Sequence, residues 1–381
     1  MAAADSTFVG SLPTDAGKNA QSLPRYAAPR EIGSFSVVGK NREYLGDRSE
    51  LKYLCMPKEP DALSWDLNSG MPEAVWADAG KPRNLNRLLR WITENWQLLA
   101  PHQGSKRESL GVDFVCKRGL LSRLARTPYK TYDKWLFSAT LFRGTIYLCE
   151  VTSESRAAWE TENSEAVRQA EFWGHKFKKL MASAQPGMSP DMDAPLICFD
   201  QFYVVLKGRL ESHSLLFTTE VDAIDSDVPH DPGSTAAYVK LRSTRYTNCM
   251  SQVLKFHRNK LLTYWSQCFL EGFPRVLIGF RTMDDEVRSI KSYSVEEMQD
   301  LGKGFDPALL GLVLAPLNPG PAQLGCCLGY ACHPPGPRHK DNVVYFFSYD
   351  IKKEKEVTCR RLSKPGKFKF LPASYLENFS K

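Results

Sequence analysis

The chain lacks the long apolar stretches that membrane-spanning helices need. Among its 381 residues we find no uninterrupted apolar window of about 18 residues, so we expect no membrane span. The N-terminal segment also lacks a charged start followed by an apolar core, which predicts that no secretory signal is present. No strong run of Lys and Arg occurs either. We expect the segment 1–25 to be a flexible N-terminus.

A disulfide framework is also not indicated. The ten cysteines are scattered and the chain is not small, which favours a reduced, intracellular protein. The tightest group is Cys326, Cys327, Cys332 and His333. It lacks paired Cys-x-x-Cys spacing and lies in a stretch rich in Gly and Pro, so loop cysteines are favoured over a zinc site.

Excess charge of one sign is modest. The formal net charge is +7, which suits an anionic partner without requiring one. Hydrophobic residues make up 43% of the chain and charged residues 24%, and these are the proportions of a soluble globular protein.

The hydrophobic patterns predict helices and strands in alternation. Amphipathic or helical patterns occupy 84–100, 119–130, 154–183 and 249–272. Strand-like patterns occupy 135–151, with a turn at 143–144, and then 196–210, 214–225, 236–244, 275–282 and 287–294. Helices that flank a mixed or antiparallel sheet indicate an α+β (mixed α/β) fold. No linker divides the chain, so we expect one domain over 26–381.

Two neighbouring strand patterns carry an unusual set of charges. Glu220 and Asp222 are two residues apart and therefore fall on one face of a strand, while Lys240 and Arg242 do the same on the next strand pattern. Two adjacent carboxylates repel each other, so they are used to bind a divalent metal or a basic partner, unless they simply face water at a strand end. In metal-dependent nucleases an acid on one strand and an acid-x-Lys on the next hold the metal and assist catalysis. Here the spacing is kept, but bases replace that second acid and its lysine.

Several blocks in the same order resemble one known family. They are "PREIGSFS", "RGLLSRLARTPY", "FRGTIYLCEV", "GHKFKKLM", "EVDAID", "YVKLR", "HRNKLLTYWSQCFLEGFPRVLIGFR" and "FLPASYLENF". Together they resemble the DXO family of RNA decapping exoribonucleases and pyrophosphohydrolases, over about 29–379. The resemblance implies two β-sheets, one of them large and central, flanked by helices, with a deep pocket between them for the RNA 5′ end. It also implies Mg²⁺ or Mn²⁺ chemistry on 5′-phosphorylated or incompletely capped RNA.

The resemblance assigns RNA-binding roles to side chains around the pocket. The family's motif arginine, which contacts RNA phosphate, falls at Arg118, and its substrate-positioning helix glutamine falls at Gln267. Either residue alone could also be an ordinary surface or hydrogen-bonding side chain. Lys240 and Arg242 complete the expected RNA-binding set.

The resemblance also shows which metal-site positions have changed. The family's Glu-x-Asp is kept at Glu220 and Asp222, which would be the metal ligands only if a metal is bound at all. The glutamate of its Gly-x-x-x-Glu segment falls at Lys178, and its Glu-x-Lys falls at Lys240 and Arg242. No catalytic residue is therefore expected among these five remnant positions.

The substitutions oppose metal binding. Two unit charges about 4 Å apart interact by about 4 kcal/mol at an effective dielectric constant near 20, so two ammonium groups would repel a divalent ion strongly. We expect Lys178 and Lys240 instead to pair with Glu220 and Asp222, and Arg242 to form a phosphate-binding surface with Arg118. No cofactor is then expected, although Mg²⁺ or Mn²⁺ would be needed if the protein were active.

Three functional hypotheses follow. The first is a pseudoenzyme that binds RNA 5′ ends and protects or scaffolds nuclear transcripts, similar to Cutoff, a fly member of the family that acts in the piRNA pathway. The second is an active decapping nuclease or pyrophosphohydrolase whose site is rearranged around the nearby acids Asp225, Asp227 and Glu211. The third is a module that binds only proteins. The resemblance implies a nuclear location and, as partners, a nuclear 5′-3′ exoribonuclease or heterochromatin-associated proteins.

Overall fold

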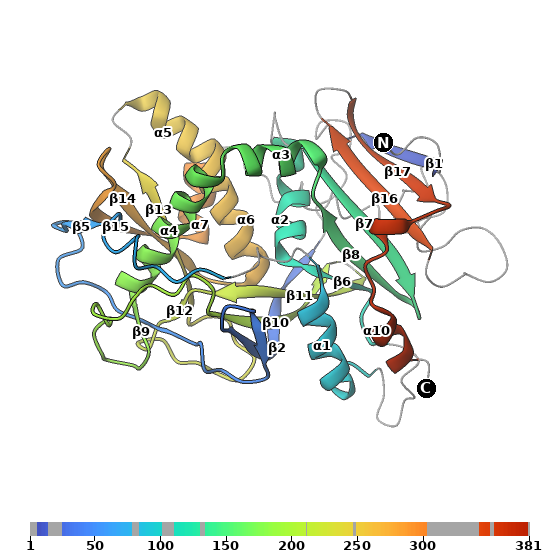
Figure 1. Cartoon of the computed structure of the whole chain (residues 1–381), viewed down its shortest axis with the longest axis horizontal. Helices are drawn as coiled ribbons and strands as arrows, with labels where there is room; N and C mark the ends of the chain where they lie inside the picture. The colour runs from blue at the N-terminus through green and yellow to red at the C-terminus, as the bar shows by residue number, and fades with distance from the viewer. Residues whose placement is uncertain are drawn as a thin grey trace.

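The computed structural model describes residues 6–13, 25–77, 84–100, 110–129, 134–210, 212–246, 249–302, 343–350 and 354–379. Within these residues the chain forms two β-sheets with helices on their faces and between them (Figure 1). The predicted fold class, mixed α/β with one large sheet, is confirmed. None of the described helices is long and apolar enough to cross a membrane.

The larger sheet has ten strands in the order β1-β17-β16-β7-β8-β6-β11-β10-β2-β3. Most neighbouring strands are antiparallel, but β6 runs parallel to both β8 and β11. The strands are β1 (Ser6–Pro13), β2 (Tyr26–Val38), β3 (Glu43–Leu45), β6 (Phe114–Lys117), β7 (Lys134–Phe142), β8 (Thr145–Val151), β10 (Gln201–Leu210), β11 (His213–Val221), β16 (Val344–Asp350) and β17 (Glu354–Leu362).

The smaller sheet has seven strands in the order β5-β15-β14-β13-β12-β4-β9. Its central pair, β13 and β14, is parallel, and the flanking pairs β12–β13 and β14–β15 are antiparallel. The strands are β4 (Tyr53–Leu54), β5 (Trp65–Asp66), β9 (Ala182–Ser183), β12 (Ala223–Ile224), β13 (Tyr238–Arg245), β14 (Arg275–Arg281) and β15 (Glu286–Ser294).

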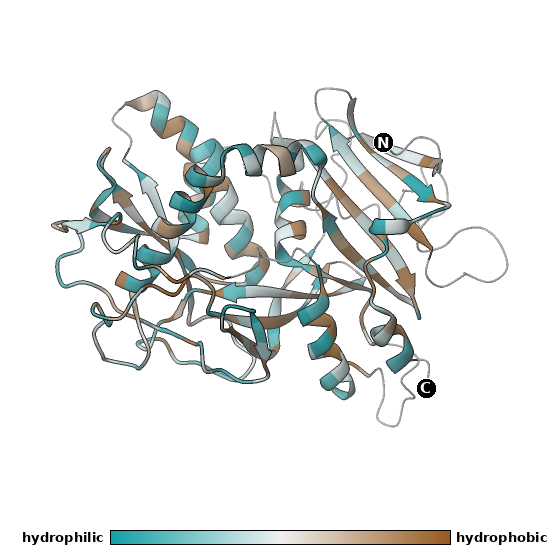
Figure 2. Cartoon of the chain, viewed as in Figure 1, coloured by the Kyte–Doolittle hydropathy of each residue, from teal (hydrophilic) through white to brown (hydrophobic). Residues whose placement is uncertain are grey.

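The helices cover the faces of the two sheets. They are α1 (Asn86–Glu94), α2 (Arg118–Arg126), α3 (Glu154–Glu162), α4 (Ser164–Leu180), α5 (Met250–Phe256), α6 (Leu262–Glu271), α7 (Val295–Leu301) and α10 (Ala373–Asn378). Short helical turns are η2 (Trp96–Leu98), η3 (Thr127–Tyr129), η4 (His257–Leu261) and η6 (Gly366–Phe368). Most of them carry polar residues on one side and apolar residues on the other (Figure 2).

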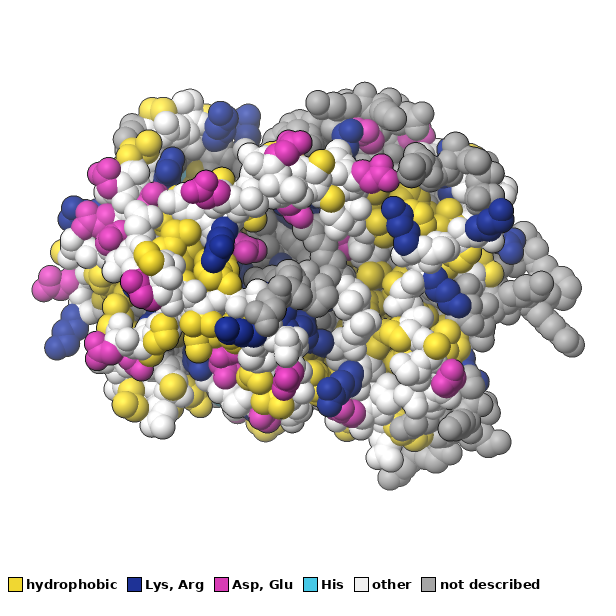
Figure 3. Space-filling view, in the orientation of Figure 1, with side chains coloured by type: hydrophobic (Ala, Val, Ile, Leu, Met, Phe, Trp, Pro, Cys, Tyr) yellow, Lys and Arg dark blue, Asp and Glu magenta, His cyan; other side chains and the backbone are white. Residues whose placement is uncertain are grey.

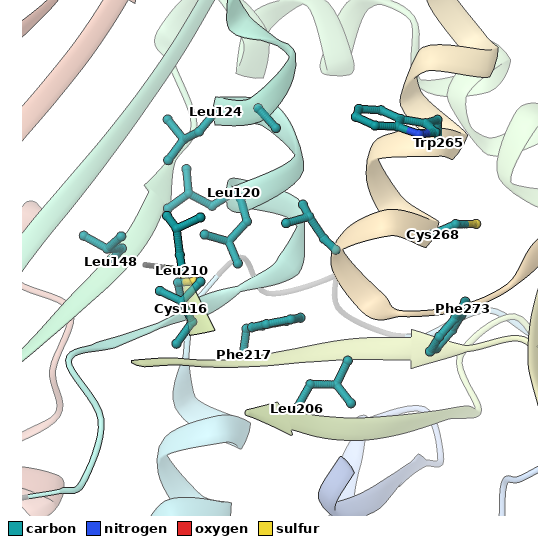
Figure 4. Packing of buried hydrophobic residues seen from close by; sticks show 14 of the residues in the cluster. Cys116, Leu120, Leu124, Leu148, Leu206, Leu210, Phe217, Trp265, Cys268 and Phe273 are labelled. Carbon is teal, nitrogen blue, oxygen red and sulfur yellow. The ribbon is translucent and has the colours of Figure 1, made fainter. Parts of the chain in front are cut away.

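The main core lies where α2 and α6 meet the larger sheet. Leu120 and Leu124 of α2, Trp265 and Cys268 of α6, and Phe217 of β11 belong to this one cluster of buried residues (Figure 4). Buried residues of β14 in the smaller sheet belong to the same cluster, so this core joins the two sheets. Helices α1 and α10 cover the opposite face of the larger sheet, and α4 covers the opposite face of the smaller one.

Two sequence predictions about local structure can be compared directly. The amphipathic pattern at 84–100 forms α1 and η2, in which Leu88, Leu89 and Ile92 are buried as expected. The N-terminus differs from the prediction, because Ser6–Pro13 forms the edge strand β1, which pairs antiparallel with β17. An open sheet edge supplies backbone partners for this segment, and the expectation of flexibility over residues 1–25 as a whole stays a prediction. The cysteine group at 326–333 lies outside the described residues.

Candidate functional site

The site is built where the chain crosses from one sheet to the other. Strand β11 of the larger sheet ends at Val221 and strand β12 of the smaller sheet begins at Ala223, so Asp222 is the crossing residue. Because Ala223 pairs with Val239 in antiparallel register, the next residues along the ladder are Asp222 and Lys240. The backbone N–H of Leu241 donates to Asp222 Oδ2 at 2.9 Å.

Helix α4 brings Lys178 to both retained carboxylates. The Lys178 ammonium lies 2.5 Å from Glu220 Oε1 and 2.6 Å from Asp222 Oδ1. The helix is held against the smaller sheet by Phe172 and Phe177, which are fully buried in the layer beneath it. The predicted pairing of Lys178 with Glu220 and Asp222 is therefore present.

Arg242 occupies the other side of Asp222. Its Nη1 donates to Asp222 Oδ2 at 2.7 Å, and its Nη2 lies 3.4 Å from Gln267 Oε1 on α6. The Asp222 side chain is 1% exposed, so its charge is matched within the protein by two cations. A buried carboxylate of this kind is stable only when it is paired.

The pKa values follow from this pairing. Burial by itself would raise the pKa of Asp222, but the charges of Arg242, Lys178 and Lys240 outweigh burial and hold it well below its usual range. Burial by itself would lower the pKa of Lys178, but Asp222 and Glu220 raise it above its usual value. Asp222 and Lys178 are therefore both charged at neutral pH.

A buried carboxylate that the sequence analysis missed lies beside this cluster. Glu271, at the end of α6, is 0% exposed and accepts from Arg118 Nε at 2.6 Å and from Lys240 Nζ at 3.1 Å. The hydroxyl of Thr219 also donates to Glu271. Since Glu271 lies one helical turn after Gln267, the i,i+4 spacing from that glutamine was the signal that could have found it.

Lys240 therefore differs from its predicted role. It was expected to pair with the carboxylates of Glu220 and Asp222, but its ammonium faces Glu271 and donates to the backbone carbonyl oxygen of Glu220 at 2.5 Å. The side chain is 1% exposed and lies over the ring of Phe273 at 4.8 Å. Burial lowers its pKa, only partly opposed by Glu271. The strand turns Lys240 into the core rather than toward the pocket.

The expected phosphate surface of Arg118 and Arg242 is also altered. The parallel pairing of β6 with β11 places Arg118 next to Thr219, and its guanidinium is then bound by Glu271. Arg118 and Arg242 remain 14% and 23% exposed, respectively. The structure brings all the predicted site residues together, but each of these two arginines is paired with a buried carboxylate.

A pocket of about 310 Å³ opens beside the cluster. Lys178, Glu220 and Asp222 form one wall, and the lining also includes the basic residues Lys52, His175 and Lys179 and the acidic residues Glu50, Asp191 and Asp200. The space-filling view shows that this face of the molecule is hollowed near its middle, with basic and acidic side chains at the margin (Figure 3).

The residues of the site do not fit a divalent metal. The protonated ammonium of Lys178 and the guanidinium of Arg242 carry positive charge and offer no lone pair to a metal, yet they occupy the oxygens that would bind one. Over the part of the chain that the structure describes, no group of three or more His, Cys, Asp or Glu side chains has a metal-binding arrangement. Asp225, one of the nearby acids, pairs with Arg275 instead.

The fold and the paired Glu-x-Asp define a class of nucleases. A family model described as RAI1-like PD-(D/E)XK nuclease matches residues 27–376. The chain is 34% identical to the decapping and exoribonuclease protein of Bos taurus over 290 residues, which cover 76% of this chain and 72% of the relative. The chain therefore belongs to the RAI1-like family of PD-(D/E)XK nucleases, which includes the decapping and exoribonuclease proteins.

Other relatives match over more of their length. The Mus musculus decapping and exoribonuclease protein is 30% identical over 381 residues, which cover 98% of this chain and 90% of the relative. Rai1 of Scheffersomyces stipitis, solved with (3′-NADP)⁺ and calcium, superposes with a TM-score of 0.79 at 21% identity, covering 98% of both chains. Candida albicans Rai1, solved with pU5 and Mn²⁺, gives a TM-score of 0.77 at 18% identity, over 97% of this chain and 99% of that chain.

Proposed function

We propose that this protein binds the 5′ end of RNA in the family pocket and does not carry out metal-dependent hydrolysis. The observation that carries the proposal is the Lys178 ammonium, which lies within 2.6 Å of both Glu220 and Asp222. A divalent ion at these carboxylates would have to displace a buried ion pair and then lie beside Arg242. Both steps are unfavourable, because they leave cations desolvated and unpaired.

Support for the RNA ligand comes from the pocket and from the relatives. The pocket remains open beside the paired cluster, and Lys52, Lys178 and Lys179 line it. A Rai1 structure with the same fold holds pU5. We therefore propose that a 5′-phosphate enters this pocket and is attracted by the ammonium groups of Lys52 and Lys179 rather than by a metal, since Lys178 is already paired with Glu220 and Asp222.

A hydrolysis assay tests the loss of activity. The purified protein is incubated with 5′-triphosphate, 5′-monophosphate and unmethylated-cap RNA, with Mg²⁺ or Mn²⁺, and released product is measured. We expect no product above the blank, while the bovine relative, run in parallel, serves as the positive control. Product release that requires Mn²⁺ and is abolished by Asp222→Ala would show instead an active enzyme with a rearranged site.

A binding assay tests retention of the RNA end. Affinity for 5′-phosphorylated RNA is measured in EDTA and compared with the same RNA carrying a 5′-hydroxyl. We expect the phosphate to increase affinity, and Lys52→Gln to weaken this preference, because Lys52 lines the pocket and is 40% exposed. Equal affinity for both RNAs, at the level of salt-sensitive background binding, would favour a module that binds only proteins.

The proposed cellular role follows from the family. We propose a nuclear protein that protects or scaffolds transcripts, with a nuclear 5′-3′ exoribonuclease or heterochromatin-associated proteins as partners. Imaging of the tagged protein and identification of cross-linked partners test this role. A wholly cytoplasmic distribution would contradict it.

A further inference from the structure

A second basic cluster lies at the carboxyl ends of the parallel strands β13 and β14. The strands end at Arg245 and Arg281, which are register partners. Both guanidinium groups form an ion pair with the same oxygen, Oδ1 of Asp285. Arg245 Nη2 lies 3.6 Å from it. Lys260 of η4 reaches the same end of β13, where its Nζ donates to Thr244 Oγ1 at 2.7 Å. Two of these three cations therefore share one carboxylate, and the third, Lys260, contacts a hydroxyl group instead.

The positive charge of this cluster is not balanced. Within the described residues, no carboxylate lies within ion-pair distance of Lys260. Burial, followed by the charges of Arg281 and Arg245, lowers the pKa of Lys260. Burial and Arg245 lower the pKa of Arg281 to about 10. Like charges held this close are costly unless an anion joins them, so the cluster has the electrostatics of an anion-binding site.

An exposed aromatic ring stands beside these cations. Tyr246 directly follows Arg245, is 60% exposed, and is fixed in place because its N–H donates to the carbonyl oxygen of Arg281 at 2.7 Å. Its ring meets Phe280 edge-on at 6.4 Å. Basic and hydrophobic side chains lie together over α5 at this corner of the molecule (Figure 3). Proteins that bind single-stranded nucleic acids combine basic side chains, which contact the phosphates, with an aromatic ring on which a base stacks.

The cluster lies at a consistent distance from the pocket residues. On β13, Arg245 follows Arg242 by three residues, or about 10 Å along the strand, and its side chain leaves the opposite face. On α4, Trp173, whose ring lies 4.0 Å from the Arg281 guanidinium, precedes Lys178 by five residues, or about 8 Å. The distance between the two sites is thus similar along the strand and along the helix. A chain of a few nucleotides spans this separation.

We propose that Arg245, Lys260 and Arg281, with the ring of Tyr246, bind the RNA segment immediately 3′ of the end held in the pocket. The cations contact its phosphates, and Tyr246 stacks on a base. This inference rests on the proposed RNA-binding function. An RNA is favoured over an acidic protein segment. The carboxylates of such a segment would pair with the cations, but they would leave the exposed ring of Tyr246 without a stacking partner.

RNA length is the variable that tests this contact. Fluorescence anisotropy in EDTA compares a 5′-phosphorylated dinucleotide, which reaches only the pocket, with an RNA of about ten nucleotides. The variant R245Q/K260Q removes two exposed cations and leaves the more buried Arg281 in place. The matched control, K134Q/K367Q, removes two exposed cations elsewhere on the molecule. Far-UV circular dichroism and melting curves confirm that each variant is folded.

The expected result is selective. R245Q/K260Q should weaken binding of the longer RNA by about tenfold or more and reduce its salt slope by about 1.4, which is about 0.7 for each lost phosphate contact. Its dinucleotide affinity should match that of the control. Tyr246→Ala should weaken the longer RNA about fivefold without changing the salt slope, because stacking releases no counterions.

The possible failures can be told apart. If neither RNA binds above background, the proposed function is wrong and the second site loses its ligand. If both RNAs bind but R245Q/K260Q and K134Q/K367Q have the same affinity for the longer RNA, the proposed second site is wrong while the proposed function stands. If a polyglutamate peptide displaces the longer RNA only from the protein with intact Arg245 and Lys260, and Tyr246→Ala has no effect, the cluster is an acidic-protein site instead.

Discussion

Lys178 brings to the carboxylates of Glu220 and Asp222 the positive charge that a metal ion would otherwise bring. The two differ in coordination, because an ammonium donates hydrogen bonds and cannot activate a water molecule as a Lewis acid. Charge neutralisation and catalysis are therefore separable at this site. Under the proposed function, a single side chain neutralises the carboxylates without supplying catalysis.

Reversing this charge should create metal dependence. In the Lys178→Glu variant three carboxylates would face one another beside Arg242, so we expect the melting temperature to fall and then to rise on addition of Mn²⁺. Breaking the pair costs about 3–5 kcal/mol. Thermal unfolding with and without Mn²⁺ measures the effect, and Lys176→Glu on the same helix is the control. A comparable Mn²⁺ shift in the unaltered protein would argue against displacement of the metal by Lys178.

Acid stability should depend on Asp222. Its pKa in the folded protein lies below the value of about 3.9 in the unfolded chain. The ionised carboxylate therefore stabilises the fold above about pH 4, and this stability is lost as the pH falls further, toward the folded-state pKa. We expect Asp222→Asn to lower the free energy of unfolding at pH 7 and to flatten its dependence on pH below about 4. Denaturant unfolding at several pH values measures both, with Asp61→Asn as an exposed control; equal acid profiles would contradict the assignment.

Much of this site could be predicted, the charges on the two strands from residue spacing and Lys178 from the family resemblance. Glu220, Asp222, Lys178 and Arg242 come together as the family motifs imply. The pairing of Lys240 could not be predicted in this way, because it depends on Glu271, for which the spacing from Gln267 is the only signal and which tertiary packing brings near Lys240. Period-two spacing shows which residues share a strand face, but not which partner that face meets.

At the scale of elements, helix α4 owes its position to a close approach to strand β14. A Cβ at Gly279 would overlap the ring of Phe177, which lies one residue before Lys178. The absence of a side chain at Gly279 thus allows α4 to approach the sheet closely enough for Lys178 to reach Asp222. The helix and strand patterns were predictable from the sequence, whereas this contact between elements distant in the chain was not.

A methyl group at this contact should disturb the helix. Gly279→Ala should destabilise the fold by about 1–3 kcal/mol, because the ring or the helix must move. Phe177→Leu in the same chain should recover part of the loss, as a double-mutant cycle of unfolding free energies would show. Gly174→Ala is the matched control, since a Cβ there meets nothing within 4 Å and alanine favours a helix. Equal effects at both glycines would rule out the steric explanation.

At the scale of the whole molecule, the N-terminal strand completes an edge of the larger sheet. Strand β1 pairs with β17, whose other neighbour is β16. We predicted flexibility for this segment because it lies at a chain terminus, whereas it pairs with a strand over 340 residues away. Such long-range pairing is not visible in a local pattern.

Removing this strand should expose the edge. We expect deletion of residues 1–13 to cause concentration-dependent self-association, because the free N–H and C=O groups of β17 can pair with another chain. Light scattering coupled to size-exclusion chromatography measures the mass at several concentrations. Deletion of residues 1–5, which leaves β1 intact, is the control. If the deletion variant keeps the same oligomeric state as the full-length protein at every concentration, the exposed edge of β17 does not cause self-association.

The position of Asp222 at the crossing between the two sheets has a consequence for comparing sequences within the family. Asp222 anchors one sheet to the other through Lys178 and Arg242, so it contributes to folding whether or not the protein hydrolyses anything. Its retention in a homologue therefore carries little information about catalysis. The residues opposite it, at positions equivalent to 178 and 242, are the better markers by which active and inactive members can be sorted.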